Sequence, residues 1–193
     1  MKIVFFGVGA VCSVMATLLD ELSNKSKQKD INFVFVVRNI KKAQGHFFKN
    51  SNILNKSDFL EIKHFEEIFE DSKKYENYLR NSDIFINSST PSFNLPIMNL
   101  ALKYNTNYAD LASDIYKDEI LSTLKFDQQI LENEFKSQNL FALINLGISP
   151  GITNFLIGEK IHSLKNLPYE VKIKKLEINL LEEIQSKKLI FSW

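Results

Sequence analysis

The chain opens with short apolar runs that alternate with a helical pattern. Residues 2–6 form a continuous apolar run, which is typical of a strand buried in a parallel sheet. Apolar residues then recur at helical spacing between Ala10 and Leu22, and residues 31–37 form a second apolar run rich in Val and Phe. The order strand, helix, strand predicts a βαβ unit with a right-handed crossover.

The same alternation continues along the chain after a stretch with a weaker pattern. Strands that alternate with helices predict an α/β fold, a doubly wound parallel sheet. In the weaker stretch we expect a short helix at 40–48, a strand at 59–62 and part of a helix at 73–79. Beyond it we expect strands at 83–87, 107–109 and 140–144, and helices at 95–104, 117–136 and 151–162.

The pattern changes after Pro168. Residues 171–181 alternate between apolar and polar types, which predicts a half-buried strand. We therefore expect a first domain over residues 1–150. Residues 151–193 would be a linking helix and the truncated start of a second α/β domain.

Composition excludes several classes of protein. Lys and Arg number 24 against 23 Asp and Glu, and this net charge of +1 argues against a nucleic-acid-binding protein. No apolar run approaches the ~18–20 residues of a membrane span, and Gly7 and Gly9 interrupt the start in a way that a secretory signal does not. A cytoplasmic protein without a membrane partner is the simplest interpretation. The single cysteine and three scattered histidines predict neither a disulfide nor a metal site.

A glycine turn separates the first strand from the first helix. In a dinucleotide site the first glycine, here Gly7, allows the turn, and the second, Gly9, lets the backbone approach a pyrophosphate at the helix N-terminus. Cys12 takes the third position, which usually carries Gly or Ala. We interpret Gly7, Gly9, Ala10, Val11 and Cys12 as a pyrophosphate-binding turn, with a plain tight turn as the alternative. Because helix amides favour a thiolate, we expect Cys12 to react with thiol reagents and bound cofactor to shield it.

The end of the second strand indicates which dinucleotide binds. A carboxylate at this point binds the ribose hydroxyls of NAD, whereas an arginine suits the 2′-phosphate of NADP. The sequence here is Val37-Arg38-Asn39, without an acid. Arg38 therefore predicts NADP, with NAD as the alternative cofactor and a solvated arginine as the alternative interpretation.

Polar residues also follow the later strands. Ser88, Ser89, Thr90 and Pro91 leave the strand at 83–87 at its carboxyl end, the edge that faces the ligand crevice. We expect them to contact the cofactor, and the alternative is a polar loop with a helix cap. Asp110 follows the next strand, where it could be a catalytic acid–base group, a helix cap or a buried hydrogen-bonding group.

A helix start is predicted at Ser149-Pro150-Gly151. Serine is a good N-cap and proline suits the first helical position. Such a helix terminus can also hold an anion.

Taken together, three stretches resemble the saccharopine dehydrogenase-like family of NAD(P)-dependent oxidoreductases. They are GVGAVCSVMATLL at 7–19, INSSTPSFNLPIMNLALKYNTNYADLAS at 86–113 and NLGISPGITN at 145–154, in this order, and FSW at 191–193 is similar to the start of a further family segment. The resemblance is poor over residues 39–73.

The resemblance implies a Rossmann domain followed by a mixed α/β domain that holds much of the substrate. Family members transfer hydride to or from a C–N bond of an amino-acid or polyamine-type substrate. By position, the glycine turn would hold the pyrophosphate and Arg38 the 2′-phosphate. The nicotinamide side would be lined by Ser88–Pro91 and Ala109–Ala112 and closed by Gly147, Pro150 and Gly151.

Two functional hypotheses follow. The first is an NADP-dependent oxidoreductase of this type, in whole or as its cofactor-binding part. The second is a non-catalytic dinucleotide-binding module. Since family members continue well beyond residue 193, we expect this chain to bind cofactor without turning over a substrate. The residues leave the oligomeric state open, with a homodimer among the alternatives.

Overall fold

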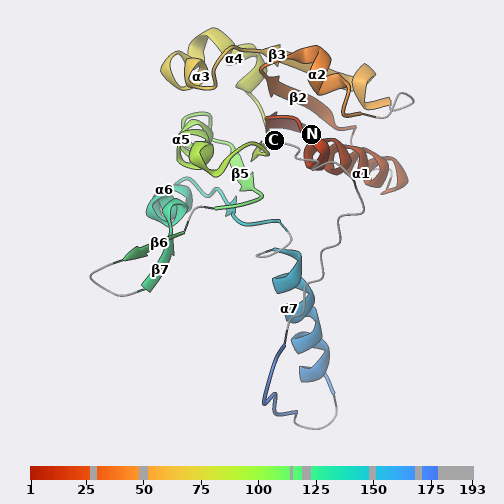
Figure 1. Cartoon of the computed structure of the whole chain (residues 1–193), viewed down its shortest axis with the longest axis vertical. Coiled ribbons are helices and arrows are strands. Elements are labelled where there is room, and N and C mark those ends of the chain that lie inside the picture. The colour runs from red at the N-terminus through yellow and green to blue at the C-terminus, as the bar shows by residue number, and fades with distance from the viewer. Residues whose placement is uncertain are drawn as a thin grey trace, which may run out of the picture.

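A parallel sheet with helices on both faces forms the centre of the molecule (Figure 1). The computed structural model describes residues 1–26, 30–47, 52–113, 115–118, 123–147, 151–167 and 171–177. Within these residues the sheet has six strands in the order β3-β2-β1-β4-β5-β8, all parallel. The strands are β1 (Lys2–Phe6), β2 (Asn32–Val37), β3 (Ser57–Glu61), β4 (Ile84–Asn87), β5 (Asn107–Asp110) and β8 (Ala142–Leu143). The predicted doubly wound α/β sheet is confirmed.

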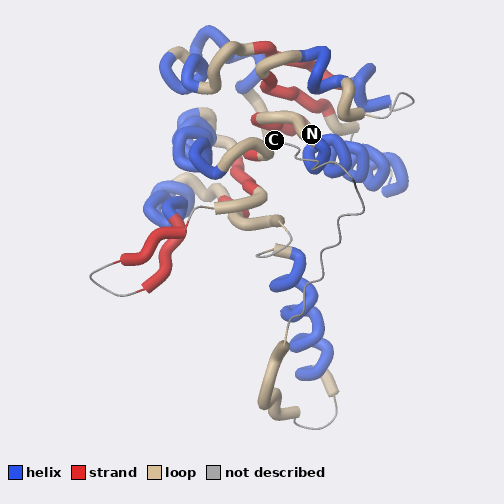
Figure 2. The backbone as a smooth tube through the Cα atoms, in the orientation of Figure 1, coloured by secondary structure: helices blue, strands red, loops and turns tan. Residues whose placement is uncertain are grey.

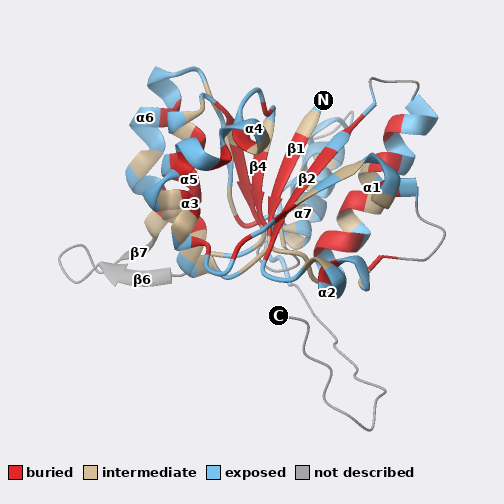
Figure 3. Ribbon diagram, turned by 90° about the horizontal axis from the view of Figure 1, so that it is seen from above, coloured by how far each residue is buried: buried red, intermediate tan, exposed pale blue. Residues whose placement is uncertain are grey.

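Helices cover the two faces of this sheet. Figure 3 shows α1 and α2 on one side of the strands and α3, α5 and α6 on the other. The helices are α1 (Ala10–Ser26), α2 (Ile40–Gln44), α3 (Glu66–Glu70), α4 (Glu76–Leu79), α5 (Asn94–Lys103), α6 (Glu132–Ser137) and α7 (Ile152–Lys165), with 3-10 turns η1 (Asn52–Lys56), η2 (Ser72–Tyr75), η3 (Pro91–Phe93) and η4 (Asp127–Leu131).

Strand pleating divides the core into two halves. In β1, Ile3 and Phe5 belong to the cluster on the α1 side, whereas Val4 and Phe6 belong to the opposite cluster. Successive side chains of a strand point to opposite faces, so a strand buried on both sides needs a continuous apolar run. This is why the apolar runs at β1 and β2 could be recognised as central strands.

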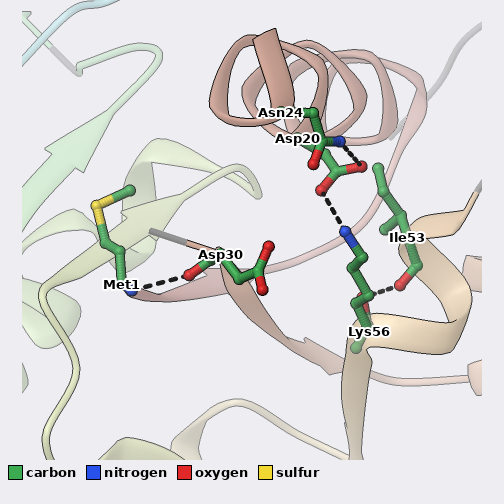
Figure 4. Close-up of polar contacts among 7 residues, drawn as sticks. Met1, Asp20, Asn24, Asp30, Ile53 and Lys56 are labelled. Atoms are coloured by element: carbon green, nitrogen blue, oxygen red, sulfur yellow. Dashed lines mark hydrogen bonds and ion pairs between the residues drawn. The ribbon is translucent and has the colours of Figure 1, made fainter. Parts of the chain in front are cut away.

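Helix α1 forms as predicted, but it packs on the sheet with a different face from the one its apolar spacing suggests. Its buried residues are small or polar: Cys12, Ser13, Ala16, Asp20 and Ser23. Asp20 is buried because it accepts hydrogen bonds from Lys56 Nζ at 3.4 Å and from Asn24 Nδ2 at 3.2 Å (Figure 4). The ion pair ties α1 to η1.

Four of the larger apolar side chains of α1 lie on the outer face, whereas Met15 and Leu19 pack partly against the core. Val11, Val14, Leu18 and Leu22 are each more than half exposed. Their spacing of three and four residues places them in one stripe along the helix. Apolar periodicity therefore located this helix correctly but did not show which face contacts the sheet.

Two predicted elements differ from the structure. The helix expected at 117–136 is wrong over its first part, because β6 (Ile115–Asp118) and β7 (Thr123–Phe126) form an antiparallel hairpin, and helical structure begins only at Asp127. Hairpin backbone pairing here overrides the helical spacing of the apolar residues. The strand expected at 171–181 is also wrong over 171–177, which have no regular secondary structure, and 178–181 lie outside the described residues.

The predicted linking helix is present as α7. It extends away from the layered part of the molecule (Figure 2), and none of its residues is buried. The expected division into two domains stays a prediction.

Phe35 lies at the centre of the core half that faces α1. Its ring is 5.5 Å from Phe5, 5.2 Å from Phe47 and 5.3 Å from Phe59, measured between ring centroids. We expect Phe35→Ala to lower the free energy of unfolding by about 3–5 kcal/mol, because it removes a fully buried ring and leaves a cavity. Denaturant titration measures this. The half-exposed Phe141 is the control, and Phe141→Ala should change stability by about 0.5 kcal/mol or less. Equal effects of the two substitutions would contradict this account of the core.

Candidate functional site

The loops that follow β1 and β4 meet at the carboxyl edge of the sheet. β1 pairs with β2 on one side and β4 on the other, so the chain order reverses at this point. The Ser88 hydroxyl donates a hydrogen bond to the Gly7 carbonyl oxygen at 2.7 Å, and the Ser88 amide donates to the Phe6 carbonyl oxygen at 3.1 Å. Ligands of open α/β sheets bind in the crevice at such a reversal point.

Gly7 is required by the backbone geometry of this junction. Its φ is +92°, a conformation that residues with a side chain rarely adopt. A Cβ atom at this position would lie 2.9 Å from the Cβ of Ser89. The first glycine of the turn thus allows both the bend and the close approach of the β4 loop.

Gly9 serves a different purpose. A Cβ added at Gly9 would meet no atom within 4 Å, so the protein itself leaves room for a side chain there. The space in front of Gly9 belongs to a cleft at the N-terminus of α1, whose amides are available to an anion. A glycine at this point keeps the backbone accessible, as a pyrophosphate requires, and the residues present therefore fit a dinucleotide.

The cleft has a volume of about 670 Å³. It brings together most of the predicted cofactor residues: Gly7, Gly9, Ala10, Val11, Cys12, Arg38, Ser88, Ser89 and Thr90. It does not include Pro91, Ala109, Asp110, Gly147 or Gly151, and Pro150 lies outside the described residues.

A buried amide network holds the β4 loop. The Asn87 side-chain oxygen accepts hydrogen bonds from the Ser89 amide at 3.0 Å and the Ser89 hydroxyl at 2.6 Å. The Asn87 side-chain nitrogen donates to the Thr90 carbonyl oxygen at 3.0 Å and to Asn94 Oδ1 at 2.6 Å. Asn94 Oδ1 also accepts from the Tyr108 hydroxyl at 2.9 Å. Because every partner is satisfied, this network fixes the loop that carries Ser88–Thr90.

The other end of the cleft carries polar and charged side chains. Arg38 follows β2, Lys42 lies on α2, and His64 and Glu66 follow β3, all exposed and all lining the cleft. Glu61 lies beside this group, since its Oε1 accepts a hydrogen bond from the Ile40 amide at 3.4 Å. The residues that follow β2 include no acid, but Glu61 at the end of β3 lies nearby.

The sequence interpretation missed several lining residues. They are Val8, Val37, Asn39, Lys42, Ala43, His64, Phe65, Glu66 and Phe93, whereas Leu111 lies within the range 109–112 that the family resemblance implied. A usable signal existed for His64–Glu66, because they follow a strand at its carboxyl end as Ser88 does. The weak strand pattern of β3 hid that signal.

Cys12 does not have the reactive thiolate that its position predicted. Its side chain is 1% exposed, and burial raises the pKa of the thiol to about 12, with a hydrogen bond to Ser88 opposing the rise. Desolvation of the charged form outweighs the effect of the helix amides. The expectation of a reactive Cys12 was therefore wrong.

Asp110 is buried at the end of β5. One carboxylate oxygen accepts a hydrogen bond from the Asn145 amide at 2.8 Å, and the other accepts from Gln128 Nε2 at 3.1 Å. Its carbonyl oxygen accepts from the Leu146 amide at 2.9 Å. Burial raises the pKa of this carboxyl group, and the hydrogen bonds oppose the rise. These contacts connect β5 to η4 and to the segment that leads into α7.

Gly147 and Gly151 approach each other closely at that segment. Gly151 has φ +134°, and a Cβ there would lie 2.0 Å from the Gly147 carbonyl oxygen. The Ile152 amide donates to the same oxygen at 2.9 Å, where α7 begins. The structure thus gives the glycine at 151 a steric reason, and its predicted role beside the cofactor stays a prediction.

The described part of the chain contains neither a candidate metal cluster nor a candidate membrane span. Among these residues no group of three or more His, Cys, Asp and Glu could hold a metal ion. Likewise, none of the described helices combines the length and the apolar character needed to cross a membrane.

The two glycines of the turn should respond differently to substitution. Gly9→Leu should leave thermal stability unchanged but weaken NADPH binding roughly tenfold or more, since its side chain would occupy the pyrophosphate position. Gly7→Ala should instead destabilise the fold by about 1–3 kcal/mol, because of its positive φ and the contact with Ser89. Thermal unfolding and titration of NADPH fluorescence measure the two effects. Unchanged NADPH affinity in Gly9→Leu would place the phosphates elsewhere.

Native Cys12 should resist alkylation with or without NADPH. At about pH 8, a pKa of about 12 leaves roughly one thiolate in ten thousand, and the thiol is also buried. Mass spectrometry gives the alkylation rate, and the urea-unfolded chain serves as the reactive control. Fast native alkylation that NADPH blocks would restore the original expectation.

The same shift predicts how stability depends on pH. Because the native pKa of Cys12 lies above the ordinary 9.0, the folded state keeps its proton to a higher pH than the unfolded chain. The free energy of unfolding should therefore fall as pH rises from about 9 towards 12.

Comparison with known proteins identifies the family of this chain. The family model described as the saccharopine dehydrogenase NADP binding domain matches residues 3–143. Saccharopine dehydrogenase (L-Glu forming) from Saccharomyces cerevisiae shares the fold with a TM-score of 0.56 at 17% identity, over 85% of this chain and 31% of that chain. The protein yvaA from Bacillus subtilis matches with a TM-score of 0.51 at 13% identity, over 87% of this chain and 41% of that one. No curated protein matches the sequence.

These matches show how much of the related proteins this chain covers. The chain spans about a third of the length of the yeast enzyme and less than half of the Bacillus protein. The family match covers the cleft from the glycine turn to Leu111 and continues through β8. The predicted family and cofactor are confirmed, and the chain belongs to the saccharopine dehydrogenase family through its NADP-binding domain.

Proposed function

We propose that this protein transfers hydride between NADP and a C–N bond of an amino-acid or polyamine-type substrate. The observation that carries the proposal is the cleft itself, which runs from cations after β2, across the glycine turn, to the fixed loop after β4. This order matches the order of adenosine phosphate, pyrophosphate and nicotinamide in the cofactor. The substrate class rests on the family to which the chain belongs.

Each part of the cleft would perform one task. The amides of the turn at Gly9 and Ala10 would bind the pyrophosphate, and Arg38 would bind the 2′-phosphate. Ser88, hydrogen-bonded to Gly7, and Thr90, held by Asn87, would orient the nicotinamide. When bound, NADP supplies or accepts the hydride.

Asp110 stays the predicted acid–base residue. Burial raises the pKa of this carboxyl group above its ordinary value, as is common for acid–base residues in active sites. Its two carboxylate oxygens, however, already accept hydrogen bonds from Asn145 and Gln128. Proton exchange with a substrate would require one of these contacts to open.

Isotope transfer tests the proposed reaction. The protein is expressed from its complete open reading frame and incubated with NADP and secondary amines, such as saccharopine, that carry deuterium on the carbon attached to nitrogen. We expect deuterium to appear in the reduced cofactor, as measured by mass spectrometry, and Gly9→Leu to abolish the transfer. Deuterium transfer from an alcohol but from no amine would contradict the reaction class. Tight NADPH binding without transfer from any donor would favour a non-catalytic module.

A further inference from the structure

We infer that Lys42 is a second cation for the 2′-phosphate of NADP and determines the preference for NADP together with Arg38. The β2 pattern pointed to Arg38 alone. The inference concerns only cofactor recognition, so it does not depend on the substrate or the reaction proposed above.

The local backbone places the two cations at the same end of the cleft. Arg38 is the first residue after β2, and Lys42 follows four positions later on α2; both line the cleft. Between them, Asn39 caps the helix: its Oδ1 accepts a hydrogen bond from the Lys42 amide at 2.8 Å. The Asn39 carbonyl oxygen also accepts from the Ala43 amide at 3.0 Å. These bonds fix the backbone of Lys42 relative to the end of β2.

Neither side chain is neutralised by an acid in the described part of the chain. Among the described residues, Lys56, Arg80 and Lys136 form ion pairs with acidic side chains, but Arg38 and Lys42 form none. Both are exposed, so their charges remain solvated until a ligand arrives. Two unpaired cations at one end of a dinucleotide cleft match the double negative charge of a phosphate monoester.

The acids near the cations explain why one cation would be insufficient. Glu66 lines the cleft, and Glu61 lies beside it through its contact with the Ile40 amide. Either carboxylate would oppose a phosphate in this region by repulsion. Arg38 can form paired hydrogen bonds to two phosphate oxygens, whereas Lys42 adds a compact charge that offsets the acids.

Lys41 offers a matched control. It is adjacent to Lys42 on the same helix, it carries the same charge and is also exposed, and it does not line the cleft. A general change of surface charge would affect both lysines alike. A direct phosphate contact would affect Lys42 alone.

Calorimetric titration with 2′,5′-ADP and 5′-AMP provides the test, because these probes differ only in the 2′-phosphate. We expect Lys42→Ala to weaken 2′,5′-ADP binding about 10- to 100-fold, the usual range for a charge-assisted hydrogen bond, and to change 5′-AMP binding less than about twofold. Lys41→Ala should change neither affinity more than about twofold. Lys42→Arg should retain most of the preference for 2′,5′-ADP, and added salt should reduce it in the wild type.

Three results would overturn the inference. One is an unchanged ratio of the two affinities in Lys42→Ala. Another is an equal loss in Lys41→Ala, which would indicate a long-range charge effect. The third is a wild type that binds both probes equally. Because no substrate is present in the titration, the outcome is separate from that of the isotope experiment.

Discussion

The site depends on one close contact, between the backbone at Gly7 and the loop at Ser89. The strand order places β4 directly beside β1, so the loops that leave these strands approach each other closely. They coexist because Gly7 has no side chain and adopts a positive φ. Once they are in contact, Ser88 joins them with hydrogen bonds to Phe6 and Gly7, and the end of α1 becomes the floor of a cleft.

The two ends of that cleft are built on different physical principles. Towards β4 and β5 the groups are neutral, buried and mutually hydrogen-bonded, as in the set formed by Asn87, Asn94 and Tyr108. Such a network gives a fixed geometry, which a reacting ring needs. Towards β2 the groups are polar or charged and exposed, and a phosphate can accept charge-assisted hydrogen bonds there without a rigid cage. In the proposed mode of binding, one end of the site would orient the nicotinamide and the other end would bind the phosphate.

The sequence identified the parts of the fold that depend on local patterns. The continuous apolar runs predicted β1 and β2, and the glycines between a strand and a helix predicted the turn, because backbone conformation there is a local property. His64 escaped notice because its place in the cleft comes from the strand order, which brings the β3 loop beside the β2 end. Lys42 escaped notice although it lies only four residues after Arg38, because the rule for the end of β2 concerns the strand end alone. Asp110 could be placed at the sheet edge, but its contacts with Gln128 and Asn145 depend on long-range packing. The same holds for the hairpin of β6 and β7, where strand pairing prevails over helical spacing.

The unusual third position of the glycine motif is related to the way in which α1 packs. Close packing of a helix on a strand needs small residues on the inner face, and α1 supplies Cys12, Ser13 and Ala16 there. A cysteine is tolerated because its thiol is neutral and hydrogen-bonds Ser88. Small inner residues bring the helix amides near the turn, and of the larger apolar residues of α1 only Met15 and Leu19 pack partly against the core. Val11, Val14, Leu18 and Leu22 consequently lie on the outer face, so the same packing that forms the cleft also produces the apolar stripe.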